Sequence, residues 1–428
     1  MKPPPSGRRA LLFVGITLLL DTIGFGLIMP VMPALLVDVT GQTLDRAAVH
    51  GGWLAFSYAL VQFFCAPILG GLSDRFGRRP VLLFAVGMLG IDYIVMALAP
   101  SLLFLFIGRI LAGMAGASFT PAYAYVADVS PPEKRAQNFG LIAAMFGVGF
   151  IAGPAIGGLI GSLGPRAPFA AAAALSLANF AYGVFVLPES LPQDKRRPFE
   201  WRRANPLGTL LQMRKRPAVL GLLAALFLWM VGHQVMPATW SFYTKFRFSW
   251  PEGMIGASLA GAGIMMALSQ ALLVRPLVAR FGERRTALLG IAVATTGYLG
   301  YGLATSGWMM FAWLGTWLLG ALVMPTTQGL MSRRVEANAQ GELQGAVASL
   351  FSLSAIIGPP MMSQLFGAFT RPGASSHVPG AAFFAAAVLS VAAFFIYWAA
   401  TRPATDDPKQ QVGDRGGTGP LVPAAGAT

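Results

Sequence analysis

The chain has 428 residues, of which 55% are hydrophobic and only 11% are charged. A soluble domain carries about 25% charged residues, so a water-soluble globule is excluded and lipid is the expected solvent. The single cysteine, Cys65, excludes an internal disulfide. The net charge of +14 would suit a nucleic-acid partner, but the placement of the basic residues explains it without one.

Apolar stretches of about 18 residues or more are candidate membrane spans. The first stretch follows a basic N-terminal segment and is too long for a signal-peptide core, so we expect it to be retained. The sequence predicts twelve spans, near residues 10–35, 52–71, 80–99, 102–124, 137–162, 167–188, 217–240, 253–275, 285–304, 307–330, 343–368 and 379–401.

Most connections between these spans are short, with one exception at residues 189–216. This segment is rich in Lys and Arg and is predicted to be a cytoplasmic loop between two six-helix bundles, at residues 1–188 and 217–401. Residues 402–428 are rich in Gly, Pro, Ala and Asp and are typical of a disordered tail. The predicted fold class is therefore an all-α membrane protein.

Basic residues are distributed very unequally between the two sides of these spans. With both termini inside, the inner segments hold 25 Lys and Arg residues, the outer loops hold five, and Arg109 lies within a span. Positive charge in short loops marks the cytoplasmic side. The sequence therefore predicts that both termini are cytoplasmic.

The two halves resemble each other at a constant spacing of 205 residues. Pairs at this spacing are Phe76 with Phe281, Gly153-Pro154 with Gly358-Pro359, and Gly140 with Gly345. A shared offset indicates parallel repeats related by a pseudo-two-fold axis along the membrane normal.

Two motifs resemble those of a known family. The loop from Gly70 to Pro80 reads GGLSDRFGRRP and resembles the G-x-x-x-D-R-x-G-R-R signature of the major facilitator superfamily. The segment from Gly149 to Gly158 reads GFIAGPAIGG and is similar to the antiporter motif of drug:proton exporters with twelve or fourteen spans. On this resemblance the chain is identified as a twelve-span major facilitator protein that works as an antiporter.

Further segments resemble the tetracycline efflux proteins of that superfamily. They are LDTIGFGLIMP from Leu20, YALVQ from Tyr58 and GELQG from Gly341. The resemblance covers spans one to eleven and implies a bacterial inner-membrane exporter.

Three ionisable residues, Asp21, Asp92 and Arg109, fall near the middle of predicted spans, judged from the helical rise of about 1.5 Å per residue. Such residues are costly in a membrane and are functional candidates by default. A carboxyl group in a low-dielectric medium can hold a proton near neutral pH, and a nearby Arg opposes this. The two acids and Arg109 are predicted to take part in proton or substrate binding, with the role of an organising charge as the alternative for Arg109, because Arg does not deprotonate. The alternative is a static Asp–Arg pair that only fixes helix packing.

Tyr58 and Gln62 are four residues apart in span two and are expected to share a helix face. The resemblance implies that they contribute to the drug pathway, while interhelical hydrogen bonding is an equal alternative. Weaker candidates for the pathway are Gln270 in span eight and Gln328 in span ten. His233, beside Gln234 in span seven, is a weaker candidate for a proton site.

The signature loop is predicted to form a cytoplasmic gate. Asp74 can cap a helix N-terminus across the interface between the halves, and Arg78 is expected to reach Asp128. Mere anchoring by positive charge explains the arginines but not Asp74. The predicted gate comprises Gly70, Asp74, Arg75, Gly77, Arg78, Arg79 and Asp128.

Small residues in the fifth span are expected to permit tight helix contact, and its proline is expected to bend the helix. These residues of the antiporter motif are Gly149, Gly153, Pro154, Gly157 and Gly158.

The chain departs from the tetracycline exporters in its C-terminal half. Ala294 and Met266 stand where those proteins usually carry an acid in span nine and a histidine in span eight. The offset also carries the intramembrane charges onto uncharged residues, namely Leu226, Gly297 and Leu314, and it carries Asp74 onto Ala279. Proton coupling is therefore predicted to rest on the N-terminal half.

The resulting hypothesis is a monomeric, proton-coupled antiporter that exports a tetracycline-like drug by alternating access. The proton gradient supplies the energy, no cofactor is expected, and Mg²⁺ would travel with the drug as its chelate. The alternatives are an exporter of another amphipathic compound, and a uniporter or non-transporting sensor. An enzyme is not expected, because no span carries a nucleophile–base pair or a metal-ligand cluster.

Overall fold

The computed structural model describes residues 7–116, 119–200, 217–336 and 339–402, and these ranges contain helices and no strand. The N-terminal half forms α1 (Gly7–Ile28), α2 (Met32–Thr40), α3 (Leu44–Phe76), α4 (Arg78–Leu98), α5 (Leu102–Ala115), α6 (Phe119–Val129), α7 (Arg135–Gly161) and α8 (Ala167–Val186). The C-terminal half forms α10 (Pro217–His233), α11 (Val235–Phe248), α12 (Glu252–Leu268), α13 (Val274–Leu303), α14 (Gly307–Trp313), α15 (Trp317–Gly320), α16 (Val323–Arg333), α17 (Gln340–Thr370) and α18 (Ala381–Ala400).

Eleven helical segments of the described chain are long and apolar enough to cross a membrane. One of them, Glu252–Leu303, has 52 residues and joins α12 to α13 through a π-helical turn. At about 1.5 Å per residue it is more than twice as long as a bilayer core of about 30 Å. Gly282 interrupts it with φ 74° and ψ 164°. Two of the twelve predicted spans, 253–275 and 285–304, fall within this one segment, and the count reaches twelve only if the segment is divided near Gly282.

The predicted span near 307–330 is divided into α14, α15 and α16, and two further predicted spans contain helix breaks that the hydropathy pattern did not show. The span near 10–35 is divided between α1 and α2, and the span near 217–240 is divided between α10 and α11, which continues to Phe248. Each break lies about four residues before a proline, Pro33 in α2 and Pro237 in α11. Proline has no N–H to donate to the carbonyl four residues earlier, so the helix is weakest there.

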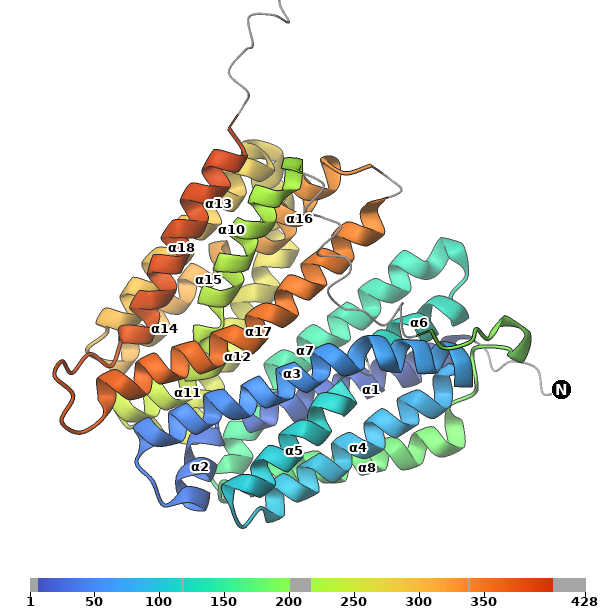
Figure 1. The fold of residues 1–428 in the computed structure, drawn as a ribbon, viewed down its shortest axis with the longest axis horizontal. Coiled ribbons are helices and arrows are strands. Elements are labelled where there is room, and N and C mark those ends of the chain that lie inside the picture. Colours follow the sequence, from blue (N-terminus) through green and yellow to red (C-terminus); the bar gives the residue numbers. More distant parts are fainter. Residues whose placement is uncertain (1–6, 117–118, 201–216, 337–338, 403–428) are drawn as a thin grey trace, which may run out of the picture.

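The helices pack as two bundles, one from α1 to α8 and one from α10 to α18 (Figure 1). The bundles touch each other mainly through α3 against α17 and α7 against α12. The repeat is visible in the backbone, because Gly77 and Gly282, 205 residues apart, both have positive φ, 105° and 74°. Only glycine adopts such angles readily. The predicted boundaries at 188, 216 and 401 remain predictions; residues 201–216 and the tail beyond 402 lie outside the described ranges.

Contacts between the bundles gather at the end that the charge pattern predicts to be outside. The Ser241 hydroxyl donates a hydrogen bond of 2.8 Å to the Met29 carbonyl. A Cβ on Gly52 would come within 2.8 Å of the Pro359 carbonyl oxygen, so α3 and α17 touch at backbone distance. Toward the other end, which carries α6 and α16, the ribbons of the two bundles diverge (Figure 1).

Candidate functional site

The structure brings two of the three predicted intramembrane charges together. Arg109 on α5 donates a hydrogen bond of 2.8 Å to Asp92 on α4. Asp92 is fully buried and Arg109 is 7% exposed. A Cβ on Gly108 would lie 2.8 Å from Asp92 Oδ1, so the glycine lets α5 approach closely enough for the pair to form. Asp92 therefore has its counter-charge on the neighbouring helix.

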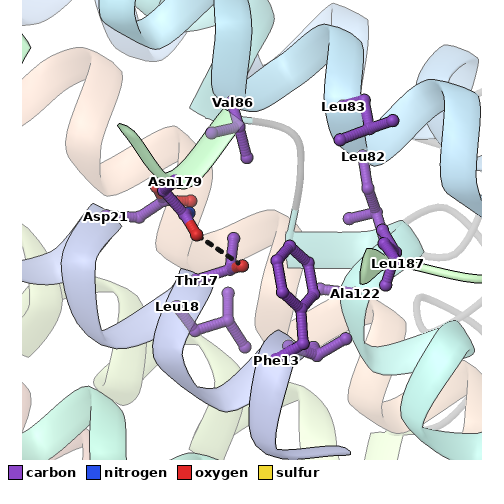
Figure 2. Close-up of a pocket in the computed structure, with 11 residues that line it drawn as sticks. Phe13, Thr17, Leu18, Asp21, Leu82, Leu83, Val86, Ala122, Asn179 and Leu187 are labelled. Carbon is purple, nitrogen blue, oxygen red and sulfur yellow. Dashed lines mark hydrogen bonds between the residues drawn. The ribbon is translucent and has the colours of Figure 1, made fainter. Parts of the chain in front are cut away.

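Asp21 stands apart from this pair. It is 8% exposed on α1, has no ion pair among the described residues, and its Oδ1 has no hydrogen-bond partner. It lines a small pocket with Thr17 and Asn179, where Thr17 Oγ1 donates to Asn179 Oδ1 at 3.3 Å (Figure 2). The sequence analysis missed Thr17 and Asn179. The available signal was Asn179 itself, an amide in the otherwise apolar, alanine-rich α8.

Tyr58 and Gln62 lie on one face of α3, as predicted, and both approach Gly116 at the end of α5. Gln62 Nε2 donates a 2.9 Å hydrogen bond to the Gly116 carbonyl. A Cβ on Gly116 would meet the Tyr58 hydroxyl. These contacts show interhelical packing, and a role in the drug pathway stays a prediction.

The polar candidates of the C-terminal half lie in their own bundle. Gln270 Nε2 donates to the Ala321 carbonyl at 3.2 Å, Gln234 Nε2 donates to Ser354 Oγ at 3.4 Å, and Gln328 is partly buried on α16. Ala294 is buried in α13 and Met266 is partly buried in α12.

His233 is the centre of an aromatic cluster that the sequence analysis did not foresee. Its Nδ1 lies 2.9 Å from the Tyr298 hydroxyl. Its ring stacks on Trp229 with centroids 5.0 Å apart and meets the edge of Trp317 at 5.1 Å. We define the aromatic box as Trp229, His233, Tyr298 and Trp317. Aromatic residues in membrane spans are so common that composition alone did not distinguish these.

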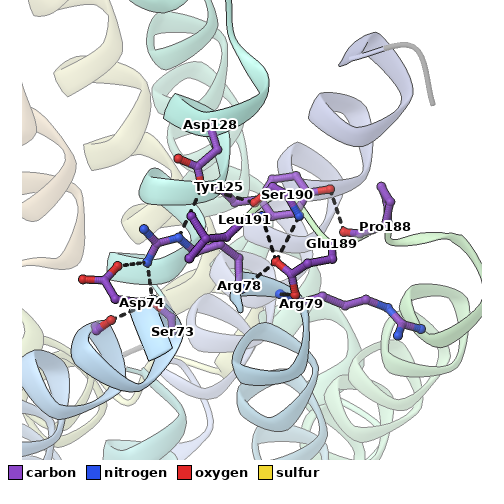
Figure 3. Close-up of polar contacts among 11 residues, drawn as sticks. Ser73, Asp74, Arg78, Arg79, Tyr125, Asp128, Pro188, Glu189, Ser190 and Leu191 are labelled. Carbon is purple, nitrogen blue, oxygen red and sulfur yellow. Dashed lines mark hydrogen bonds and ion pairs between the residues drawn. The ribbon is translucent and has the colours of Figure 1, made fainter. Parts of the chain in front are cut away.

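Four of the predicted gate residues, Asp74, Arg78, Arg79 and Asp128, belong to a network of polar contacts at the end of the N-terminal bundle (Figure 3), whereas Arg75 lies over the Phe76 ring. Arg78 pairs with Asp74 at 2.5 Å and with Asp128 at 3.2 Å, so the expected Arg78–Asp128 contact is present. Arg78 also donates to the Ser73 hydroxyl at 2.6 Å. Asp74 thus binds its own bundle here, whereas a helix cap across the interface was expected.

The N-terminus of α4 is capped by Glu189, which the sequence analysis did not select. Its carboxylate accepts hydrogen bonds from the backbone N–H groups of Arg78 and Arg79, at 2.8 and 3.3 Å. Arg79 also donates to the Val184 carbonyl at 2.6 Å. A carboxylate at a helix N-terminus satisfies free N–H groups and the helix dipole. The start of the central loop is thereby attached to the signature loop.

The C-terminal bundle repeats the Arg78–Asp128 ion pair with its charges exchanged. Adding 205 to these positions gives Glu283 and Arg333, and these two residues also form an ion pair. This exchange was not predicted from the sequence, where only Asp74 and Ala279 were compared at this end of the bundles.

The glycines of the antiporter motif serve two contacts at once. Gly149, Gly153 and Gly157 pack on α1, where a Cβ on Gly153 would lie 2.8 Å from the Gly26 Cα. Gly158 packs across the bundle interface on α12, where a Cβ would lie 2.6 Å from the Glu252 carbonyl oxygen. Pro154 lies within the same helix. The motif therefore joins α7 to its own bundle and to the other one.

Replacing Gly153 with alanine is expected to lower the thermal stability of the purified protein. The added Cβ has only backbone atoms of α1 to displace, and such overpacking costs about 1–3 kcal/mol. Gly147→Ala, six residues earlier in α7, is the matched control because nothing lies within 4 Å of its Cβ position. Thermal unfolding in detergent measures both. Equal melting temperatures for the two variants would contradict this packing.

The sequence matches the Major Facilitator Superfamily over residues 14–359 and 236–426. It is 43% identical to the class C tetracycline resistance protein of Escherichia coli, across 84% of this chain and 90% of that protein. It is 41% identical to the class G tetracycline resistance protein of Vibrio anguillarum, with the same coverage.

Solved transporter structures resemble the fold. The human organic anion transporter MFSD10 gives a TM-score of 0.66 at 24% identity, covering 92% of this chain and all of that one. A bacterial homolog of the human lysosomal transporter Spinster gives 0.72 at 16% identity, covering 94% of this chain and 98% of that one. The chain therefore belongs to the major facilitator superfamily, among its tetracycline resistance proteins, and is a drug exporter rather than an enzyme.

Proposed function

We propose that this chain is a proton-coupled antiporter that exports tetracycline-like drugs across the bacterial inner membrane, with both termini in the cytoplasm. The observation that carries the proposal is the difference between the two buried acids. Each acid has one carboxylate oxygen without a hydrogen-bond partner, but Asp92 is neutralised by Arg109, whereas Asp21 has no ion pair among the described residues. A buried ionised group without a counter-charge is costly, so Asp21 is the acid suited to take up and release a proton.

Exchange follows if the proton and the drug cannot occupy the N-terminal bundle together. A cationic drug chelate would favour the ionised form of Asp21, and a proton would favour drug release. Such negative coupling between two ligands is reciprocal. A proton entering from outside would then release the drug there, and its departure inside would prepare the site for the next drug.

The arrangement of contacts supports alternating access, with this structure as the state open to the cytoplasm. The bundles are joined at the predicted outer end by backbone-distance contacts such as Gly52 with Pro359. At the predicted cytoplasmic end the two ion pairs are each closed within one bundle. In a two-fold interface a position meets its own equivalent only at the axis, and we propose that the two ion pairs lie close to the pseudo-two-fold axis when the bundles close. Exchanged charges make that meeting attractive, because Arg78 would face Glu283 and Asp128 would face Arg333.

Reversing one of these pairs is expected to stop transport without unfolding the protein. The variant Arg78→Glu with Asp128→Arg, made together with Asp74→Asn so that no second carboxylate lies beside position 78, keeps a salt bridge in the N-terminal bundle. It gives both bundles the same charge arrangement, so the ends would repel on closing. Reversing the second pair as well, with Glu283→Arg and Arg333→Glu, should restore activity. Drug resistance of expressing cells measures the outcome, with membrane protein level as the control. Equal activity of all three forms would contradict an inter-bundle gate.

Substrate and coupling are tested by drug uptake into everted membrane vesicles. Tetracycline should accumulate when respiration acidifies the vesicle lumen, and a protonophore should prevent it. Binding to the purified protein should require Mg²⁺, since the chelate is the proposed substrate, and removing Mg²⁺ with a chelator should abolish binding. Uptake that survives collapse of the proton gradient would refute the coupling, and equal binding without Mg²⁺ would refute the chelate.

A second candidate substrate is another amphipathic aromatic compound. The aromatic box favours this, because stacked indole and imidazole rings suit a planar ligand, while the acid and histidine usual in tetracycline exporters are replaced by Ala294 and Met266. Resistance profiles of expressing cells against tetracycline and unrelated aromatic drugs distinguish the two candidates.

A further inference from the structure

Asp21 opens onto a pocket inside the N-terminal bundle, between α1, α4, α6 and α8 (Figure 2). The centre of a water molecule can occupy a volume of about 10 Å³ in this pocket. This is close to the minimum of about 10–15 Å³ that one buried water needs. The pocket therefore has room for a single water molecule.

Three polar side chains of this pocket are more than nine-tenths buried. Thr17 is 5%, Asp21 is 8% and Asn179 is 4% exposed. Asp21 Oδ1 and Asn179 Nδ2 both lack a hydrogen-bond partner, and each such buried group costs about 1–3 kcal/mol. Thr17 and Asp21 are one helical turn apart on α1, and Thr17 donates to Asn179. A donor and an acceptor without partners thus face the same small space.

The C-terminal bundle has no counterpart to this polar group. The offset of 205 residues carries Thr17 and Asp21 onto Leu222 and Leu226. The helices α8 and α18 have equal length and begin at Ala167 and Ala381, so that Asn179 corresponds to Ala393. All three C-terminal residues are buried in one apolar cluster. Apolar side chains are therefore compatible with the fold at these positions. The polar set in the N-terminal bundle is a local departure from the repeat, at a free-energy cost that packing alone does not explain.

The pocket extends from Asp21 toward the predicted cytoplasmic end of the bundle. Its other lining residues include Phe13, Leu82 and Leu187. Phe13 lies two turns before Asp21, Leu82 lies one turn after the start of α4, and Leu187 directly precedes the segment that caps α4 through Glu189. The space thus lies on the side of Asp21 from which a proton would leave in drug:proton exchange.

We propose that this pocket binds one water molecule that bridges Asp21 and Asn179 and carries the proton of Asp21 toward the cytoplasm. The water accepts hydrogen bonds from Asn179 Nδ2 and from the protonated Asp21, and it donates to Thr17 Oγ1. Asp21 transfers its proton to this water, the resulting hydronium gives its excess proton to bulk water on the cytoplasmic side, and the ionised carboxylate then accepts a hydrogen bond from the remaining water. Asn179 and Thr17 are positioning residues. This inference rests on the proposed role of Asp21 as the proton carrier.

Other titratable groups near Asp21 lie away from this pocket. Tyr93 on α4 packs on α1 at Gly24, and Tyr58 on α3 packs at Gly116 at the end of α5. Asp92 and Arg109 pair with each other. The face of α7 against α1 presents the motif glycines, and Asn179 on α8 does not titrate. Proton release through the pocket therefore depends on the water and not on a second acid.

The test separates proton-driven transport from drug exchange in proteoliposomes that contain the full-length protein. Asn179→Leu fills the pocket with hydrocarbon, and Thr17→Val removes the acceptor at equal volume. Both should slow gradient-driven tetracycline uptake about tenfold, since positioned proton transfer typically contributes at least that much, while exchange without a gradient stays near the wild-type rate. Asn179→Ser, which keeps a polar group and leaves room for water, should recover part of the driven rate.

Thr22→Val is the matched control, because the Thr22 hydroxyl is one residue from Asp21 and already donates to its own Leu18 carbonyl at 2.6 Å. Infrared difference spectra report the carboxyl band of Asp21, which should shift in Asn179→Leu and not in Thr22→Val. A parallel loss of driven transport and exchange would make Asn179 structural and overturn the proposal. Wild-type driven transport in Asn179→Leu would overturn it as well. If Asp21→Asn itself keeps proton-driven uptake, the proposed function fails; if only the pocket variants do, the water site alone fails.

Discussion

Replacing Asp21 with asparagine is expected to abolish proton-driven drug uptake into everted vesicles while leaving the protein folded. The amide keeps the shape of the side chain but cannot carry a proton. Asp21 forms no ion pair among the described residues, so the substitution leaves no charge buried without its partner. The measurements are uptake with and without a protonophore, drug exchange without a gradient, and the melting temperature in detergent. Uptake should fall to background, and the melting temperature should stay near that of the wild type.

The control for this experiment is Asp38→Asn, which neutralises an acid at the predicted outer end. Asp38 pairs with Arg166 at 3.2 Å with both side chains largely exposed, and such pairs contribute about 0–1 kcal/mol. This variant should transport normally. Proton-driven uptake by the Asp21→Asn variant, and above all by an Asp21→Asn, Asp92→Asn double variant, would remove proton coupling from the N-terminal bundle.

Replacing Asp92 with asparagine should have a large effect of a different kind, on the stability of the protein. The change leaves the Arg109 guanidinium buried without its counter-charge, and breaking a buried pair in this way costs about 3–5 kcal/mol. We therefore expect a lower melting temperature and less protein in the membrane. Removing both charges, with Asp92→Asn and Arg109→Gln, should recover most of the stability.

The double variant also decides what the pair does in transport. If it folds and supports proton-driven uptake, Asp92 and Arg109 fix the packing of α4 against α5. If it folds but does not transport, the pair takes part in substrate or proton handling. Unchanged stability of the Asp92→Asn variant would contradict the buried ion pair itself, because that pair implies a destabilising, unpaired Arg109 charge in the variant.

Several features of the fold followed from the sequence, because they depend on neighbours along the chain. Hydropathy located the apolar helices, since burial in lipid is a property of each segment taken alone. The offset of 205 residues relates Gly77 to Gly282, and both adopt a backbone angle that glycine supplies. The signature motif led to the Arg78–Asp128 contact. The helix breaks before Pro33 and Pro237 were missed because hydropathy is insensitive to a lost backbone hydrogen bond.

The geometry of the candidate site could be predicted from the sequence only in part. Depth along a helix placed Asp21, Asp92 and Arg109 at one level, since the helical rise is fixed. Which of them meet depends on how each helix is rotated about its axis and on which faces pack together. That packing paired Arg109 with Asp92 and turned Asp21 toward Asn179 of α8.

The sequence by itself thus determined that the chain spans the membrane, that it consists of two repeats, and that its buried acids lie in the first of them. Only the tertiary structure decided which acid is neutralised, how Glu189 caps α4, and that the exchanged ion pair joins Glu283 to Arg333. The physical reason is that the membrane acts on each segment separately, whereas ion pairs, caps and pockets arise where side chains from distant segments come within a few ångströms of one another.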